Sequence, residues 1–287
     1  MVLRTLVTNY LREQAQAKIY EAARQSLHAQ PDGPPAPPPT CEIAIVFATG
    51  VEAGGLVDTL EQAITTRCAN FVEHTGIIHG RPVVLVESGV GRVAASSAAA
   101  EVITLHQVQS VISAGFGTAL EGTLKRGHIV MADEVTDLHG RHFPVPVHIQ
   151  RESLVNNPSL HLGRQLTVEH PLRSAEEKHR LGENHGALCA DMESIGVVEL
   201  CQQRQLPFVS VRIITDTVDD ELPPEIERML DQRSLAGKLG AAAGALFKHP
   251  STIKEMWQLK EDALKASDRL AKFLRGVIAN LPAVPSA

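Results

Sequence analysis

The stretch that organises the chain runs from residue 186 to residue 223 and reads GALCADMESIGVVELCQQRQLPFVSVRIITDTVDDELP. Its pattern predicts a turn, a helix, a short turn, a strand and an acidic loop. Asp191 is placed to cap the helix, because its side-chain oxygen can accept from backbone N–H groups of the first turn. Helical spacing predicts one buried face made of Met192, Ile195, Val198 and Cys201.

The second half of this stretch predicts a strand buried on both faces. Residues 208–214 are apolar and largely β-branched, and Asp216 follows directly at the predicted carboxyl end. In open parallel sheets, ligands bind in the crevice at the carboxyl ends of the strands. We therefore expect Met192 and Glu193, at a helix start, to face the same cleft as Asp216.

The remaining strands and helices alternate along the chain. Further strands are predicted at residues 42–48, 70–80, 82–87, 110–114 and 128–133. Helices are predicted after residue 49 through residue 64, at 92–106, and through Lys178 and Arg180, while residues 137–160 read as an irregular excursion. This alternation predicts an α/β protein, a three-layer α/β/α sandwich with a central mixed sheet.

The two ends of the chain look different from its centre. Residues 1–30 predict an accessory helix, and the Pro-rich residues 31–40 predict a stiff linker. The domain proper is expected at 41–248, with a small-residue helix at 230–247, and a C-terminal amphipathic extension at 249–287. The apolar face of the extension is predicted to consist of Met256, Leu259, Leu264, Leu270, Phe273, Leu274, Val277 and Ile278.

Composition excludes several classes of protein. The 287-residue chain has a net charge of −6 and no basic cluster, which argues against a nucleic-acid or anionic-membrane surface. No apolar run is long enough for a membrane-spanning helix. The four cysteines form no Cys-x-x-Cys pair and no metal-ligand spacing, so we expect thiols and a cytoplasmic protein.

Three carboxylates are predicted at ends of elements that can share one crevice: Glu52, Glu193 and Asp216. Paired carboxylates suit cleavage of a glycosidic bond, one as acid and one as base. Asp216 would have to hold a proton at neutral pH, which requires a bias of about 4 kcal/mol from burial or from a bound purine. The alternatives are a solvated acidic loop and a divalent-metal site.

A dinucleotide site is the other motif to consider. Gly89, Gly91 and Ala94 meet the loose glycine fingerprint that follows a strand. That fingerprint needs an acidic residue at the end of the next strand, and the sequence there is SVISAGFG (110–117). The pattern therefore argues against a nicotinamide or flavin cofactor.

The ADMES at 190–194 and the PFVSVRIITDTVDD at 207–220 resemble the signature of the nucleoside phosphorylase and methylthioadenosine/S-adenosylhomocysteine nucleosidase superfamily, over residues 42–247. The resemblance implies that Glu52 activates water and that Asp216, after Thr215, protonates the departing purine. It implies ribose contacts from the Ser88–Gly89 turn and from the Met192–Glu193 pair. It further implies a homodimer and neither metal nor cofactor.

Several features of the sequence keep other activities open. Phosphorylases of this superfamily usually carry Pro-Ser in the helix where this chain has Val93 to Ala95, which favours water over phosphate. The ending at 246–274 resembles a hopanoid-associated subgroup that acts on a lipid-linked adenosine. The usual Gly-Ser-Ala-Gly-Gly turn is replaced at residues 114–118, and His170-Pro171 stands where an aromatic residue is usual. A nucleoside-binding module without catalysis is therefore the alternative from another class.

Overall fold

The computed structural model describes residues 40–147, 154–221 and 250–281. The predicted N-terminal helix, the linker up to residue 39 and the small-residue helix at 230–247 lie outside these residues. The division of the whole chain into domains therefore stays a prediction.

One mixed sheet of ten strands forms the centre of the described residues, in the order β10-β6-β8-β9-β5-β1-β4-β3-β2, with β7 paired to β6. The strands are β1 (Ile43–Phe47), β2 (Glu61–Arg67), β3 (Val72–Ile78), β4 (Arg81–Glu87), β5 (Ser110–Ala119), β6 (Ile129–Asp137), β7 (His142–Pro144), β8 (Leu160–Thr167), β9 (Cys189–Asp191) and β10 (Phe208–Asp216). Strand β1 is parallel to both of its neighbours, β4 and β5, whereas β2 and β3 are antiparallel.

Half of the sheet curls and closes on itself. Strand β5 pairs along most of its length with β10, and at its end Thr118 and Ala119 pair with Ala190 and Cys189 of β9. Strands β6 and β8 connect β10 back to β9. The closure brings the ends of β5, β9 and β10 together, and the last two belong to the stretch at residues 186–223.

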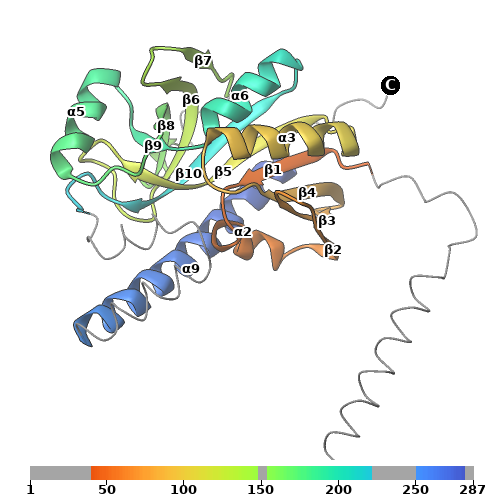
Figure 1. Cartoon of the computed structure of the whole chain (residues 1–287), viewed down its shortest axis with the longest axis horizontal. Coiled ribbons are helices and arrows are strands. Elements are labelled where there is room, and N and C mark those ends of the chain that lie inside the picture. Colours follow the sequence, from red (N-terminus) through yellow and green to blue (C-terminus); the bar gives the residue numbers. More distant parts are fainter. Residues whose placement is uncertain (1–39, 148–153, 222–249, 282–287) are drawn as a thin grey trace, which may run out of the picture. The chain divides into compact units, whose positions relative to one another are not determined.

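Helices cover both faces of the sheet, as Figure 1 shows, giving the predicted three-layer α/β/α arrangement. The helices are α2 (Gly50–Val57), α3 (Arg92–His106), α5 (Ala175–His185), α6 (Ser194–Gln203) and α9 (Pro250–Asn280). Helices α3 and α6 pack on one face, and α2 and α9 pack on the other.

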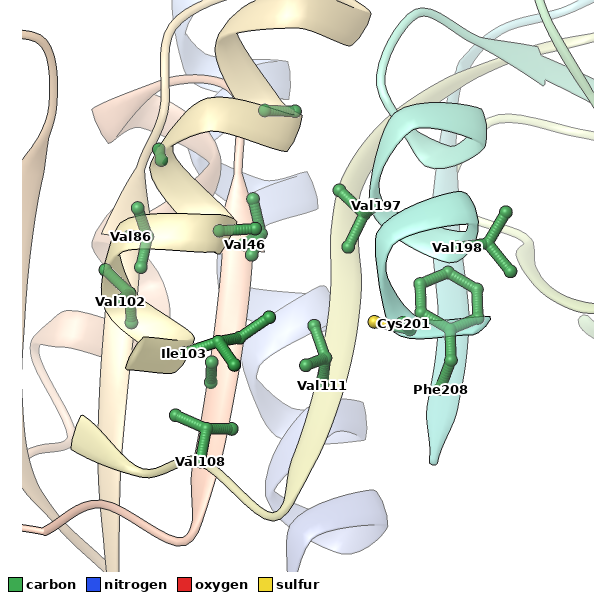
Figure 2. Close-up of a cluster of buried hydrophobic side chains, with 14 of the residues drawn as sticks. Val46, Val86, Val102, Ile103, Val108, Val111, Val197, Val198, Cys201 and Phe208 are labelled. Atoms are coloured by element: carbon green, nitrogen blue, oxygen red, sulfur yellow. The ribbon is translucent and has the colours of Figure 1, made fainter. Parts of the chain in front are cut away.

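The apolar run of β1 explains why the sheet is covered on both sides. Ala44 and Val46 pack into the core under α3 and α6, whereas Ile43, Ile45 and Phe47 pack against α2 and α9. Alternate side chains of a strand point to opposite faces, so every residue of β1 is buried. Figure 2 shows the first of these cores, where α3 and α6 supply aliphatic side chains above the sheet.

The structure corrects the predictions for several elements. The helix after residue 49 ends at Val57, and the predicted helical residues from 61 onwards form strand β2. Every residue of β2 is exposed, so this edge strand has no apolar pattern to distinguish it. Strand β8 and the short strands β7 and β9 were also not predicted, and the excursion at 137–160 contains β7.

Strand β5 continues through the glycines that were expected to end it. A Cβ on Gly115 would lie 2.7 Å from Oε1 of Glu52, and one on Gly117 would lie 3.0 Å from Cβ of Arg212. Glycine in this strand therefore marks close approach by other groups and does not mark a turn.

The predicted C-terminal helix is confirmed as α9. Leu270, Leu274 and Ile278 are buried against the sheet, whereas Leu264 is exposed, contrary to the prediction. The side chains of Met256 and Leu259 lie outside the described residues. Within the described ranges, no helix combines the length and the apolar character needed to cross a membrane.

Candidate active site

Glu52 lies in the first turn of α2, directly after strand β1, and is buried. Its Oε2 accepts hydrogen bonds from the backbone N–H of Thr49 (2.8 Å) and from the Thr49 hydroxyl (3.0 Å). Its Oε1 accepts from the backbone N–H of Phe116 (2.8 Å). These donors come from the connection between β1 and α2 and from strand β5, so the carboxylate is fixed at the end of the sheet.

Burial raises the pKa of Glu52 above its ordinary value, although the Phe116 N–H, the charge of Arg212 and the Thr49 donors act in the opposite direction. A general base works best when its pKa approaches the operating pH. A carboxylate offers about four lone-pair positions, and three are used here. One position is left to accept a hydrogen bond from water.

The glycine turn after β4 serves Glu193. Gly89 and Gly91 both have positive φ, 85° and 98°, and the backbone N–H of Gly91 donates to Oε1 of Glu193 at 2.8 Å. The backbone N–H of Met192 donates to Oε2 at 3.2 Å. The turn therefore orients the carboxylate of Glu193, which lies directly before helix α6.

Burial, followed by the nearby charge of Asp191, raises the pKa of Glu193 to about 7. Asp191 itself is buried and forms an ion pair with Arg212 of β10. It also accepts from the hydroxyl of Thr167 (2.8 Å) and from the backbone N–H of Ser194 (2.9 Å). Through the second contact Asp191 accepts from the first N–H of helix α6, as predicted, although the N-cap position itself is occupied by Glu193.

Asp216 is the last residue of β10, and both of its carboxylate oxygens have partners. The hydroxyls of Thr118 and Thr215 donate to Oδ1 at 3.1 and 3.3 Å. The ammonium of Lys178, from helix α5, donates to Oδ2 at 2.8 Å. The Asp216 side chain is 32% exposed, and the buried ammonium of Lys178 lies beside it.

Two cavities open at this end of the sheet. The first, of about 230 Å³, is lined by Ala48, Thr49, Glu52, Val90, Phe116, Gly117, Thr118, Val168, Pro171, Leu172, Ala190, Asp191, Met192, Glu193 and Thr215. The second, of about 260 Å³, shares Val90, Val168 and Met192 with the first. It extends past the start of α3 to Asp137, Leu138 and His139.

The structure brings most of the predicted site residues together. Glu52, Met192, Glu193 and Thr215 line the first cavity. Among the described residues, those lining it do not include Asp216, whose Oδ1 is held by two threonines that do line it. Met192 and Glu193 therefore line the first cavity. Thr215 lines it as well, and Asp216 lies directly next to it.

The predicted roles of Ser88 and Gly89 are not matched by their positions. Ser88 is buried, and its hydroxyl is within hydrogen-bonding distance of the carbonyl oxygens of Phe47 (3.0 Å) and Gly89 (2.8 Å). Neither residue is among the described residues that line the two cavities. It is Val90, the next residue of the turn, that faces both.

Sequence reasoning missed several residues of this site. Thr49 and the backbone of Phe116 hold Glu52, Arg212 holds Asp191, and Lys178 holds Asp216. Arg212 carried a detectable signal, because a charged residue within an otherwise apolar strand requires a buried partner. Within the described part of the chain, no group of three or more His, Cys, Asp or Glu side chains is placed to hold a metal ion.

Comparison with known proteins agrees with this arrangement. Residues 42–247 match the sequence pattern of the phosphorylase superfamily. The chain belongs to this superfamily. A similar curated member is the 5'-methylthioadenosine/S-adenosylhomocysteine nucleosidase of Colwellia psychrerythraea, 27% identical over 220 residues that cover 65% of this chain and 88% of the relative.

Solved structures of the superfamily share the fold. The S-adenosylhomocysteine nucleosidase of Streptococcus pyogenes superposes with a TM-score of 0.64 at 17% identity, covering 85% of this chain and 98% of that chain. The 5'-methylthioadenosine/S-adenosylhomocysteine nucleosidase of Campylobacter jejuni superposes with a TM-score of 0.65 at 16% identity, covering 84% and 100%. At these identities the likeness establishes the nucleoside phosphorylase-like fold.

Proposed function

We propose that this protein is a nucleosidase that hydrolyses the N-glycosidic bond of a 5'-modified adenine nucleoside, of the methylthioadenosine or S-adenosylhomocysteine type, and releases adenine. The observation that carries the proposal is the meeting of Glu52, Met192 and Glu193 in one cavity, directly beside Asp216. The activity of the Colwellia relative supports it.

The charges at the cavity favour water over phosphate as nucleophile. Two carboxylates face it, those of Glu52 and Glu193, whereas the side chain of Asp191, which is also among the lining residues, is 0% exposed and paired with Arg212. Arg212 is 1% exposed and forms an ion pair with Asp191, so its charge is already matched. A phosphate dianion next to these carboxylates would meet like charges at short range, which is unfavourable in a partly buried site. Water carries no such cost.

In the proposed reaction Glu52 is the general base. Its free lone-pair position accepts a proton from water as the water oxygen attacks the anomeric carbon of the ribose. The bond from this carbon to purine N9 breaks, and its electron pair goes to the purine. Asp216 donates a proton to a ring nitrogen of the purine, so that neutral adenine leaves. Glu193 accepts hydrogen bonds from ribose hydroxyls, and Met192 packs on the sugar.

The walls of the first cavity suit a purine. Phe116, Val168, Pro171 and Leu172 give it apolar surface. Phe116 belongs to the segment at residues 114–118 whose sequence departs from the usual turn and which forms part of β5, and its backbone N–H donates to Glu52. The changed sequence of this segment was the reason for considering a binding module without catalysis. The segment nevertheless retains the hydrogen bond from the Phe116 N–H that holds Glu52, the proposed base. This supports the enzyme over the binding module.

The second cavity offers room for the 5' substituent. The exposed side chains of Val90, Val93 and Leu138 line it, so an apolar substituent is favoured there. A lipid-linked adenosine has the largest apolar 5' substituent of the substrates considered, and it remains an alternative substrate. Phosphorolysis remains the alternative reaction.

Two further predictions concern the state of the protein. We place the enzyme in the cytoplasm, and in support none of its four cysteines, all within described residues, forms a disulfide. We also expect a homodimer.

The proposal is tested by measuring adenine release from methylthioadenosine, S-adenosylhomocysteine and adenosine, with wild type and with Asp216→Asn. Wild type should release adenine from the first two faster than from adenosine. The variant should bind methylthioadenosine but lose about 10² to 10⁴ in kcat, the usual contribution of a positioned acid. Binding of methylthioadenosine by wild type without release would instead establish the binding module.

A further inference from the structure

Lys178 is the most deeply buried ammonium group among the described residues. It lies in the first turns of helix α5, and its side chain is 2% exposed. Its Nζ donates to Oδ2 of Asp216 (2.8 Å), to the carbonyl oxygen of Thr217 (3.0 Å) and to the carbonyl oxygen of Asp220 (2.8 Å). An ammonium has three donors, so each one is used.

All three acceptors belong to the end of β10 and the loop that follows it. Burying an ammonium is costly unless it is hydrogen-bonded, and here each of its three donors has an acceptor. The one side-chain acceptor among them is the carboxyl group of Asp216. A buried cation on a separate helix is thus directed at the residue proposed to protonate the purine.

The contact fixes the orientation of Asp216. Lys178 holds Oδ2, while Thr118 and Thr215, both lining the first cavity, hold Oδ1. With both oxygens held, the carboxyl group cannot rotate about its last bond without losing partners. Oδ1, the oxygen beside the cavity, accepts only from hydroxyl groups, and hydroxyl groups can reorient when a ligand enters.

We propose that Lys178 is a positioning residue for Asp216 in the cleavage step. The inference rests on the proposed acid role of Asp216. When Asp216 gives its proton to the purine, it becomes a carboxylate, and the ammonium at Oδ2 stabilises the charge that appears. Lys178 exchanges no proton in this step, since water supplies one to Glu52 and Asp216 supplies one to the purine. Its effect is therefore confined to leaving groups that need a proton.

This confinement gives a test with two substrates. Lys178→Met removes the charge and all three donors at similar length. We compare kcat/KM for methylthioadenosine with kcat/KM for 4-nitrophenyl 5-methylthio-β-D-ribofuranoside, whose nitrophenolate leaves without protonation. The variant should lose about 10- to 10²-fold on methylthioadenosine, no more than the lower end of the 10² to 10⁴ that a positioned acid contributes, because Asp216 itself is still present. It should lose less than about threefold on the nitrophenyl riboside, a difference that a general loss of structure would not produce.

A matched control addresses the loop itself. Arg126 contacts the side chain of Asp220 from the exposed side, and Arg126→Met removes that contact without touching Asp216. This variant should lose less than about threefold on either substrate. The double variant Lys178→Met/Asp216→Asn should be no slower on methylthioadenosine than Asp216→Asn alone, because residues that act through one group are not additive.

Each outcome has one meaning. Equal losses on both substrates, or equal losses in the Arg126 control, would overturn the inference and make Lys178 a structural residue. A double variant much slower than Asp216→Asn would also overturn it. If wild type releases nitrophenolate and adenine but Asp216→Asn keeps full activity on methylthioadenosine, the failure lies in the proposed role of Asp216. Absence of adenine release by wild type would instead count against the proposed function.

Discussion

The guanidinium of Arg212 and the carboxylate of Asp191 form a buried ion pair beneath the cavity, with side chains 1% and 0% exposed. The pair joins β10 to β9 inside the closed half of the sheet. Although burial alone would lower the pKa of Arg212, the charges of Asp191, Glu193 and Glu52 raise it. The hydroxyls of Ser113 and Ser194 accept from the same guanidinium at 2.8 Å, so the charge is surrounded by polar partners.

Breaking this pair should destabilise the fold. Arg212→Met leaves the Asp191 carboxylate buried without its cation, and removing one partner of a buried pair costs about 3–5 kcal/mol. The free energy of unfolding in urea should fall by that amount at pH 7. Arg212→Met combined with Asp191→Leu should recover part of the loss. A single variant within about 1 kcal/mol of wild type would show that the pair contributes little.

Gly115 is predicted to matter for catalysis more than for folding. In Gly115→Ala the new Cβ would lie 2.7 Å from Oε1 of Glu52, so the carboxylate must move. A displacement of about 1 Å costs about 10²-fold in rate, and kcat for adenine release measures it. Gly54→Ala, in the same helix as Glu52, is the control, because a Cβ there meets nothing within 4 Å. Equal activity of both variants would contradict the placement of Glu52.

Glu52→Gln tests the base more directly. The two backbone donors, Thr49 and Phe116, face opposite oxygens of the carboxylate, so the amide of glutamine must place its NH₂ against one N–H. We expect kcat to fall about 10²- to 10⁴-fold from loss of the base, and the free energy of unfolding to fall by about 1–3 kcal/mol. Steady-state rates and urea unfolding separate the two effects. Retention of more than half of kcat would remove Glu52 from the reaction.

Glu193 should make stability depend on pH. Its pKa is raised from the model-peptide value of 4.5 to about 7, so the folded state binds the proton more tightly than the unfolded state. The resulting stability is fully present below about pH 4.5 and is lost as the pH rises to about 7. Glu193→Gln removes this dependence. The variant should therefore gain stability relative to wild type across this window, and a constant difference from pH 4 to pH 8 would contradict the assignment.

The sequence was sufficient to predict those helices and strands whose apolar residues are buried on one or both sides. The apolar residues of β1 and β10 and the apolar face of α9 correspond to packing on one or both sides, and these elements were predicted at nearly their observed positions. Strand β2 was not predicted because it is exposed along its whole length, and β9 because three residues carry too little pattern. Strand β9 is recognised as a strand only through its pairing with β5 and β8.

The positions of Glu52, Glu193 and Asp216 at element ends were predictable from the sequence, and their roles stay predictions. The site was not predictable where a residue far away in sequence completes a contact. Lys178 reads as one charge among several in a polar helix, and only the packing of α5 against the end of β10 directs it to Asp216. The ribose contact expected of Ser88 stays a prediction, and its hydroxyl lies within hydrogen-bonding distance of two backbone carbonyls.

The most direct test of the central claim, hydrolysis at this site, is identification of the sugar released from methylthioadenosine with and without phosphate. We predict adenine and free 5-methylthioribose in phosphate-free buffer, at a rate that added phosphate does not raise, and loss of both products in Glu52→Gln. Adenine release that requires phosphate and yields 5-methylthioribose 1-phosphate would contradict the account and make the enzyme a phosphorylase.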